Sequence, residues 1–192
     1  SIRSGAEPNL ENASDAVREA SEDIVDEVDR LERWVRDLLA YAVPEAGEPE
    51  NVRVSQVLDD SIEGFARVFA KRDIRVSAQA EDAATFVRAD QALLAQAFNC
   101  LLTNAMEAMP HGGEVKLSTS LSGPGRLRVS ISDTGIGFSP AGLQNAFIPR
   151  KSTKRTGLGL GLPLTRRIVE RFGGTIELVS RSTGGATVNV DL

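Results

Sequence analysis

Apolar residues recur at heptad spacing in the first part of the chain, from about residue 15 to residue 42. The repeating positions are Ile24, Val28, Leu31, Val35 and Leu38. An a/d pattern sustained over about three heptads is typical of a helix that packs on another helix. A single amphipathic helix of about 40 Å cannot bury such a stripe alone. We therefore expect this helix to pack on the domain that follows, on a partner chain, or on both.

The remainder of the chain alternates between helical and strand periodicity. Apolar stripes at helical spacing predict helices at residues 55–70, 90–109 and 164–172. Alternating apolar and polar positions predict strands at residues 74–78, 85–89, 114–120, 126–132, 175–180 and 186–191. Because strands outnumber helices and hairpins are frequent, we predict an α+β fold, a two-layer α/β sandwich. Its sheet is expected to be mixed, mostly antiparallel, with helices on one face.

Two domains are predicted from this pattern. Residues 1–46 contain the long heptad-patterned helix, and residues 47–192 form the α/β domain. The 41% apolar and 26% charged residues are ordinary for a soluble globular protein. A net charge of −5 argues against a nucleic-acid partner. The single cysteine, Cys100, excludes an internal disulfide and agrees with a cytoplasmic location. No apolar run approaches the roughly 20 residues that cross a bilayer, so no direct membrane contact is expected.

Two glycine clusters stand out in the second domain, at residues 133–137 (DTGIG) and 157–161 (GLGLG). Glycine lets a backbone approach a ligand closely and adopt positive φ. Neither cluster matches the usual phosphate loop or the dinucleotide fingerprint. The pair suggests a nucleotide held at both ends with a lid between, while two glycine-rich surface turns remain the alternative.

Asn104 lies in an otherwise apolar predicted helix, where an amide is costly unless it is hydrogen-bonded or liganded. Its carbonyl oxygen is a hard donor suited to Mg²⁺, an ion that keeps several waters and takes other ligands from substrate phosphates. The alternative is an asparagine bonded to neighbouring backbone groups.

Asp133 ends a predicted strand just before the first glycine cluster. Its carboxylate is able to accept a hydrogen bond from an exocyclic amine such as that of adenine, or from the N–H groups of its own turn. Between the clusters, residues 150–155 (RKSTKR) form a local positive patch for phosphates or a solvated basic loop. The second cluster opens into a helix near Pro163, where backbone N–H groups would face a polyphosphate.

In this order, these features resemble the catalytic and ATP-binding domain of a sensor histidine kinase, within the GHKL ATPase superfamily. The resemblance covers about residues 51–192. The parts similar to the family's N box, first glycine box, F-box region and second glycine box are Gln96–Met109, Asp133–Gly137, Ala146–Pro149 and Gly157–Leu162. The heptad helix resembles the second helix of the dimerisation and histidine-phosphotransfer domain.

The resemblance implies ATP and Mg²⁺ as ligands, with Asn104 coordinating the metal and Asp133 holding the adenine amine. Gly135 and Gly137 would line the base pocket. The second box would wrap the triphosphate through Gly157, Leu158, Gly159, Leu160, Gly161 and Leu162. Lys151 and Lys154 are weaker candidates for phosphate contacts.

The chain departs from the family at two places. Cys100 stands where the first N-box asparagine is usual, one helical turn before Asn104. Hydrolytic relatives carry a glutamate general base at this same position. The absence of that glutamate from this chain argues for a kinase or a non-hydrolytic binder. The only histidine, His111, is expected on the surface in a turn. The H box is absent, so the phosphoacceptor histidine is expected outside this chain.

The sequence thus predicts the ATP-binding catalytic core of a two-component sensor histidine kinase. The γ-phosphoryl group would pass to a histidine outside this fragment and then to a response-regulator receiver domain. A homodimer through the N-terminal helix and a membrane-anchored parent protein are both compatible with the resemblance. The alternatives are a non-catalytic nucleotide-binding regulatory module and a serine kinase of the anti-sigma-factor type.

Overall fold

The computed structural model describes residues 47–80, 86–123, 125–149, 159–181 and 184–192, together with scattered positions between residues 17 and 35. Its elements in the α/β domain are β1 (Glu50–Arg53), α2 (Val54–Lys71), β2 (Ile74–Ala80), β3 (Phe86–Ala89), α3 (Gln91–Glu107), β4 (Gly113–Gly123), β5 (Arg126–Asp133), α4 (Pro140–Asn145), α5 (Gly161–Arg171), β6 (Thr175–Ser180) and β7 (Ala186–Asp191).

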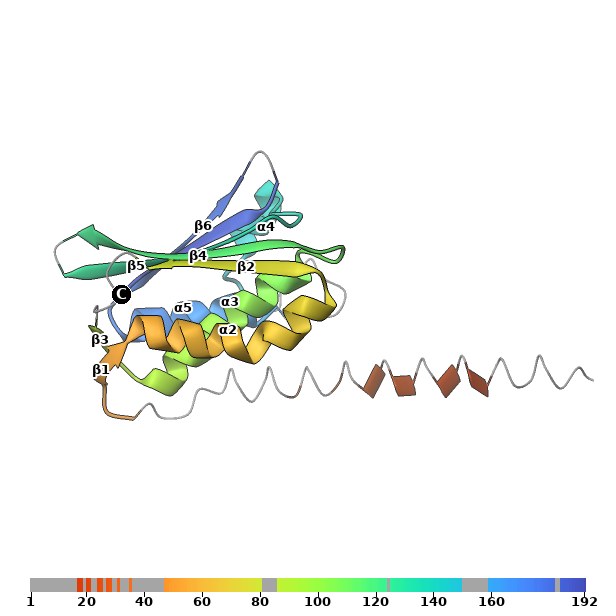
Figure 1. Cartoon of the computed structure of the whole chain (residues 1–192), viewed down its shortest axis with the longest axis horizontal. Coiled ribbons are helices and arrows are strands. Elements are labelled where there is room, and N and C mark those ends of the chain that lie inside the picture. The colour runs from red at the N-terminus through yellow and green to blue at the C-terminus, as the bar shows by residue number, and fades with distance from the viewer. Residues whose placement is uncertain are drawn as a thin grey trace, which may run out of the picture.

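Five of the strands form one sheet in the order β2-β4-β5-β7-β6. β2 pairs parallel with β4, and all other neighbours pair antiparallel. Figure 1 shows α2, α3 and α5 together on one side of this sheet. The predicted α+β sandwich, with a mixed and mostly antiparallel sheet, is therefore confirmed. β3 confirms the predicted strand at residues 85–89, and its pairing with β1 in a separate two-stranded antiparallel ribbon was not predicted.

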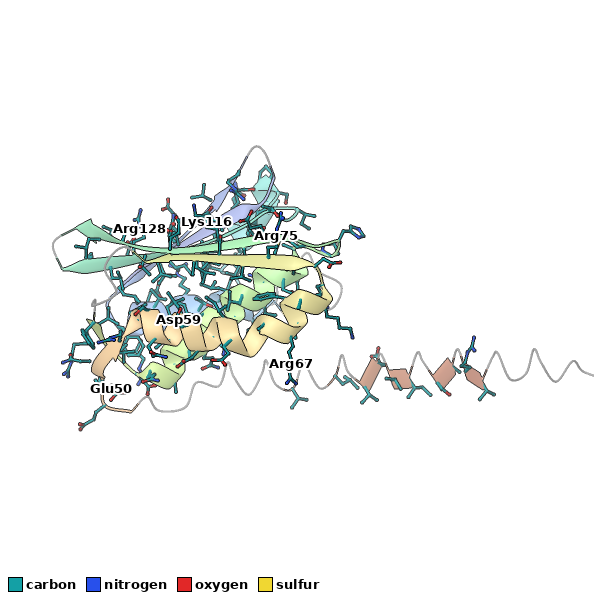
Figure 2. All side chains as sticks on the ribbon, in the orientation of Figure 1. Glu50, Asp59, Arg67, Arg75, Lys116 and Arg128 are labelled. Carbon is teal, nitrogen blue, oxygen red and sulfur yellow. The ribbon has the colours of Figure 1, made fainter. Side chains whose placement is uncertain are left out.

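The two faces of the sheet follow from the alternation along each strand. In β5, Leu127, Val129 and Ile131 are buried against the helices, and the residues between them lie on the opposite face. Figure 2 shows Lys116 and Arg128 on that outer face, pointing away from the helices. There, polar side chains pair across β5 and β7 at Arg128–Asp191, Ser130–Asn189 and Ser132–Thr187. The outer face is thus polar, and cross-strand hydrogen bonds between side chains connect β5 and β7 on it.

α3 forms the centre of the helical layer, because it contacts both α2 and α5. It buries apolar residues along most of its length: Leu93, Leu94, Ala97, Phe98, Leu101, Leu102 and Ala105. Each fully buried leucine or phenylalanine stabilises the fold by about 1.5–3 kcal/mol. Asp90 caps the helix, its carboxylate accepting hydrogen bonds from Leu93 N at 3.0 Å and from Gly47 N at 2.9 Å. The Leu93 bond is the main reason that the pKa of Asp90 is lowered.

Several predicted boundaries move by a few residues. β4 runs on to Gly123, beyond the predicted end at residue 120, with a register shift after Leu121. α5 begins at Gly161, before the predicted residue 164. The short helix α4 was not predicted, although Ser139 caps it by accepting from Gly142 N at 3.0 Å and Pro140 opens it. A helix of six residues carries too little apolar periodicity to be recognised from sequence.

The predicted heptad helix lies mostly outside the described residues. The described positions between residues 17 and 35 are helical, and their apolar side chains are exposed. For Ile24, Val28 and Leu31 the exposed fractions are 64%, 55% and 47%. The helix as a whole, and the boundary between domains 1–46 and 47–192, stay predictions. Within the described part of the chain, no helix is both long and apolar enough to cross a membrane.

Candidate nucleotide site

Asp133 stands at the end of β5 with its side chain buried, at 7% exposure. Its Oδ1 accepts hydrogen bonds from Gly135 N at 2.8 Å and from Ala186 N at 3.4 Å. The first of these is the turn bond that the sequence left open as an alternative. These bonds hold the carboxylate in one orientation at the start of the first glycine box.

The glycines of this box are required by contacts within the protein. A Cβ on Gly135 would overlap the carbonyl group of Ala108, whose oxygen accepts from Ile136 N at 3.1 Å. Gly137 has φ +68, and a Cβ there would lie 2.8 Å from the Gly185 carbonyl oxygen. Close backbone approach therefore joins the box to the end of α3 and to the β6–β7 turn. Whether Gly135 and Gly137 also line a base pocket stays a prediction.

The turn between β6 and β7 holds the glycine box from one side. Ser180 Oγ accepts from Phe138 N and donates to Phe138 O, each at 3.1 Å. Arg181 donates a side-chain hydrogen bond to the backbone carbonyl of Asp133. Gly185 has φ +83, and a Cβ there would collide with the same carbonyl. The sequence reasoning missed these three residues; the only local signal was the glycine pair in the turn.

Part of the second glycine run lies within the described residues. Gly159 has φ +65, a value that favours glycine, and Leu160 directly precedes α5. The side chains of Leu160 and Leu162 are buried, so only their backbone is available to a ligand. No side chain among the described residues caps the first turn of α5. Its early N–H groups therefore lack a side-chain acceptor from that part of the chain. Gly157, Leu158, Lys151 and Lys154 lie outside the described residues, and their roles stay predictions.

α3 brings the two glycine boxes to one helix face. A Cβ on Gly161 would lie 3.8 Å from the Cβ of Cys100, while Gly135 meets Ala108. Cys100, Asn104 and Ala108 follow at i, i+4 and i+8, so they lie on roughly one side of the helix. The two contacts are about 12 Å apart along α3, at 1.5 Å per residue. Asn104, half-buried, is midway between them.

The donor set on this face suits a metal held mainly by a substrate. The described residues contain no group of three or more His, Cys, Asp or Glu side chains placed to hold an ion. Asn104 offers one hard amide oxygen, and Asn104 already has an interaction within the chain. Mg²⁺ binds with as few as one protein ligand when substrate phosphates and water molecules complete its coordination shell. Asn99 is exposed, and at five residues from Asn104 it points to a different side of the helix.

The segment that resembles the F-box region contacts α5. The Arg166 guanidinium lies over the Phe147 ring, 5.4 Å from its centroid, and Arg166 Nε is 2.6 Å from Glu170 Oε1. This places Phe147 beside the helix that the second glycine run opens.

His111 is exposed in the turn after α3, as predicted.

Comparisons with known proteins identify the family of the chain. The family model of histidine kinase-, DNA gyrase B- and HSP90-like ATPases matches residues 89–192, just over half of the chain. Sensor histidine kinase ZraS of Klebsiella oxytoca is 35% identical over 160 residues, which cover 83% of this chain and 35% of ZraS. The chain thus spans about a third of the length of the curated relatives that it matches first.

Solved histidine kinase structures share the fold. A mycobacterial sensor histidine kinase, MprB, matches with 27% identity and a TM-score of 0.65, over 75% of this chain and 96% of that chain. Histidine kinase ThkA in complex with response regulator protein TrrA matches with 23% identity and a TM-score of 0.75. This match covers 92% of this chain and 51% of that chain. The relatives that match it first are sensor histidine kinases, and the chain belongs to the family of histidine kinase-, DNA gyrase B- and HSP90-like ATPases.

Proposed function

We propose that residues 47–192 bind ATP with Mg²⁺ and transfer its γ-phosphoryl group to a histidine, as the catalytic core of a two-component sensor kinase. The observation that carries the proposal is the meeting of both glycine boxes on the face of α3 that bears Asn104. This spacing supports a nucleotide lying along α3, with its base at Asp133 and its phosphates at the start of α5.

Each end of such a nucleotide would meet matching chemistry. The buried carboxylate of Asp133 accepts a hydrogen bond from the adenine amine. Gly135 and Gly137, which lack side chains, let the backbone of the glycine box lie close to the base. The early amides of α5 and the positive end of its dipole bind phosphate oxygens. Asn104 ligates Mg²⁺, which when bound neutralises charge on the transferring phosphoryl group. Lys151, Lys154 and the remaining residues of the second box add phosphate contacts.

In the transfer step, a histidine nitrogen forms a bond to the γ-phosphorus as the bond from that phosphorus to the β–γ bridging oxygen breaks, and ADP leaves. Positioning and charge stabilisation carry such reactions. His111 follows the N box at the surface, so the acceptor is proposed to lie in a helical domain to which residues 1–46 belong. The exposed apolar positions between residues 17 and 35 support pairing with a second copy.

A response-regulator receiver domain is the proposed final acceptor of the phosphoryl group. The complex of ThkA with TrrA supports this, because ThkA shares the fold of the chain. The reaction is proposed to take place in the cytoplasm, where ATP and such regulators are found.

Calorimetry with Mg²⁺ and a non-hydrolysable ATP analogue tests the nucleotide site. Asp133→Asn keeps the acceptor for Gly135 N but removes the charge, and should weaken binding by about 10- to 100-fold. Asp59→Asn, at an exposed position on α2, is the matched control and should bind as the unmodified chain does. Equal affinity in the Asp133 variant, or no binding by the unmodified chain, would reject the site.

Transfer is tested separately by supplying a helical domain with an H-box histidine and radiolabelled ATP. Acid-labile label on that domain supports the kinase. A non-catalytic nucleotide-binding module is the second candidate, and Cys100 favours it, because a thiol replaces a hard amide donor beside Gly161. Analogue binding without transfer to any supplied histidine domain would favour that module.

A further inference from the structure

A cavity outside the proposed nucleotide site lies between α2 and the middle of the sheet. It has a volume of about 140 Å³ and is formed between the N-terminal half of α2 and the strands β2 and β4. The pairing of β4 with β5 sets Val115 beside Asp133 and Thr119 beside Val129. The four residues from Val115 to Thr119 correspond to about 13 Å along the strand. The cavity is therefore distinct from the nucleotide site.

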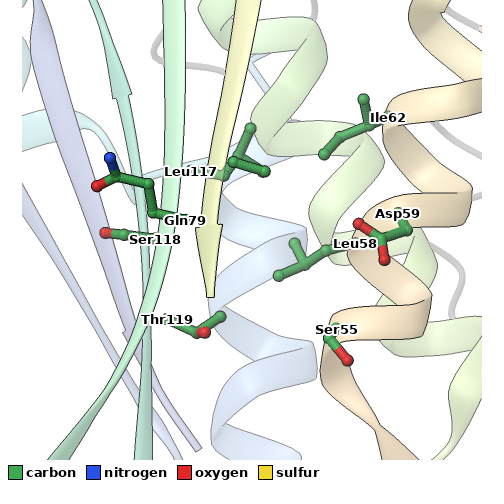
Figure 3. Close-up of a pocket in the computed structure, with 9 residues that line it drawn as sticks. Ser55, Leu58, Asp59, Ile62, Gln79, Leu117, Ser118 and Thr119 are labelled. Carbon is green, nitrogen blue, oxygen red and sulfur yellow. The ribbon is translucent and has the colours of Figure 1, made fainter. Parts of the chain in front are cut away.

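The walls of this cavity are largely apolar. Figure 3 shows Leu58 and Ile62 of α2 pointing toward Leu117 of β4 across the opening. Gln79 and Ser118 contribute backbone, while their side chains point away from α2. A cavity of this volume is comparable to engineered cavities that bind benzene. The space therefore suits a body of about the size of one aromatic ring.

One buried polar group lines this apolar space. Thr119 alternates with Val115 and Leu117 on the helix-facing side of β4 and is only 6% exposed. Its hydroxyl forms no hydrogen bond with any residue that the structure describes. A buried hydroxyl without a partner is costly, because it has lost its bonds to water. A bound molecule with a hydroxyl of its own would satisfy it.

A carboxylate marks the outer part of the cavity. Asp59 lines it from α2 and is exposed to solvent. A cation placed there would be attracted to the carboxylate while remaining partly hydrated. The lining thus offers three kinds of contact: a buried hydroxyl, an apolar middle and an exposed negative charge.

We propose that this cavity is a binding site for a small hydroxylated aromatic amine. Its ring packs between Leu58 and Leu117, its hydroxyl pairs with Thr119 Oγ, and its ammonium lies toward Asp59. The proposal does not depend on the nucleotide site, because the two sites share no residue.

Tyramine is a direct probe, and phenethylamine and 4-ethylphenol are its matched analogues without the hydroxyl and without the ammonium. The whole ¹⁵N-labelled chain is titrated with each compound and followed by NMR. Tyramine should give saturable shifts at the amides of Leu58, Leu117 and Thr119, with an affinity about threefold or more above that of either analogue. Shifts that do not saturate, or that centre on Asp133 and Gly135, would overturn the proposal.

Thr119→Val removes the hydroxyl at nearly constant shape. It should abolish the preference for tyramine over phenethylamine and raise the melting temperature of the ligand-free chain by a few degrees. Ser118→Ala, the neighbour whose side chain points away, should change neither quantity. Asp59→Asn should weaken tyramine about two- to threefold and leave 4-ethylphenol unchanged. A lower melting temperature in Thr119→Val, or an unchanged preference, would show that the hydroxyl is not available to a ligand.

Discussion

The Ser180 side chain and the Phe138 backbone exchange two hydrogen bonds, although the residues are 42 positions apart in the sequence. Ser180 Oγ accepts from Phe138 N and donates to Phe138 O, both at 3.1 Å. These bonds tie the end of β6 to the residue that follows the first glycine box. The neighbouring Arg181 reaches the carbonyl of Asp133 itself. The β6–β7 turn is therefore part of the framework that positions Asp133.

Ser180→Ala should loosen that framework without removing a proposed ligand contact. We expect a loss of about 1–2 kcal/mol in the free energy of unfolding, because two polar groups of Phe138 lose their partner. Nucleotide affinity should fall about three- to tenfold as the glycine box becomes less ordered. Urea unfolding and calorimetry measure the two effects. If the Ser180→Ala variant is less stable but binds the nucleotide with unchanged affinity, the β6–β7 turn does not position Asp133.

Gly135→Ala should be strongly destabilising, because the new methyl group would overlap the Ala108 carbonyl. We expect a loss of more than about 2 kcal/mol, measured by urea unfolding. Gly64 offers a matched control in α2, since a Cβ there would meet nothing within 4 Å. Gly64→Ala should stabilise the chain by about 0.5–1 kcal/mol through helix propensity. Similar effects in both variants would contradict the close packing of the glycine box on α3.

Asp191 should make the stability of the domain depend on pH. Two hydrogen bonds from Arg128, at 2.9 and 2.8 Å, are the main reason that the pKa of Asp191 is lowered. A carboxyl group with a lower pKa in the folded state stabilises the fold above its unfolded pKa, near 3.8. That stabilisation is lost as the pH falls through the lower, folded value. At pH 6 the unmodified chain should therefore have a larger free energy of unfolding than the Asp191→Asn variant.

The difference between the two chains should shrink as the pH is lowered below about 4. Urea unfolding from pH 6 to pH 2.5 measures it. Glu63→Gln, at an exposed position on α2, serves as the control and should show a much smaller dependence. A difference that stays constant over the whole range would mean that the ion pair does not stabilise the fold.

Cys100→Asn should strengthen metal-dependent nucleotide binding. Cys100 precedes Asn104 by one helical turn and lies beside Gly161, so a second amide oxygen would face the proposed phosphate region. We expect about a tenfold gain in affinity for the ATP analogue with Mg²⁺, and little change without the metal. Asn99→Ala, at the exposed neighbouring position, should have no effect. A gain that is equally large in the absence of Mg²⁺ would argue against a metal role for this face.

The local pattern of the sequence was sufficient for the longer elements and for the order of the motifs. The apolar stripe of α3 and the alternation in β5 predicted one helix and one strand correctly, because side-chain periodicity follows directly from backbone geometry. The same pattern put Asn104 on a helix and Asp133 at a strand end. Residue types at fixed spacing then indicated the ATPase family, which the family match supports.

Tertiary structure alone decided which elements meet and which contacts the glycines make. The contacts of Gly135 with Ala108, Ser180 with Phe138 and Arg181 with Asp133 join segments that are distant in sequence. They depend on strand order and register, which local periodicity does not encode. The sequence suggested glycines that line a ligand, and the structure adds that Gly135 and Gly137 lie tightly against the protein's own backbone. The Thr119 hydroxyl, buried without a partner among the described residues, is likewise visible only once α2 covers β4, because burial is a property of the packed fold.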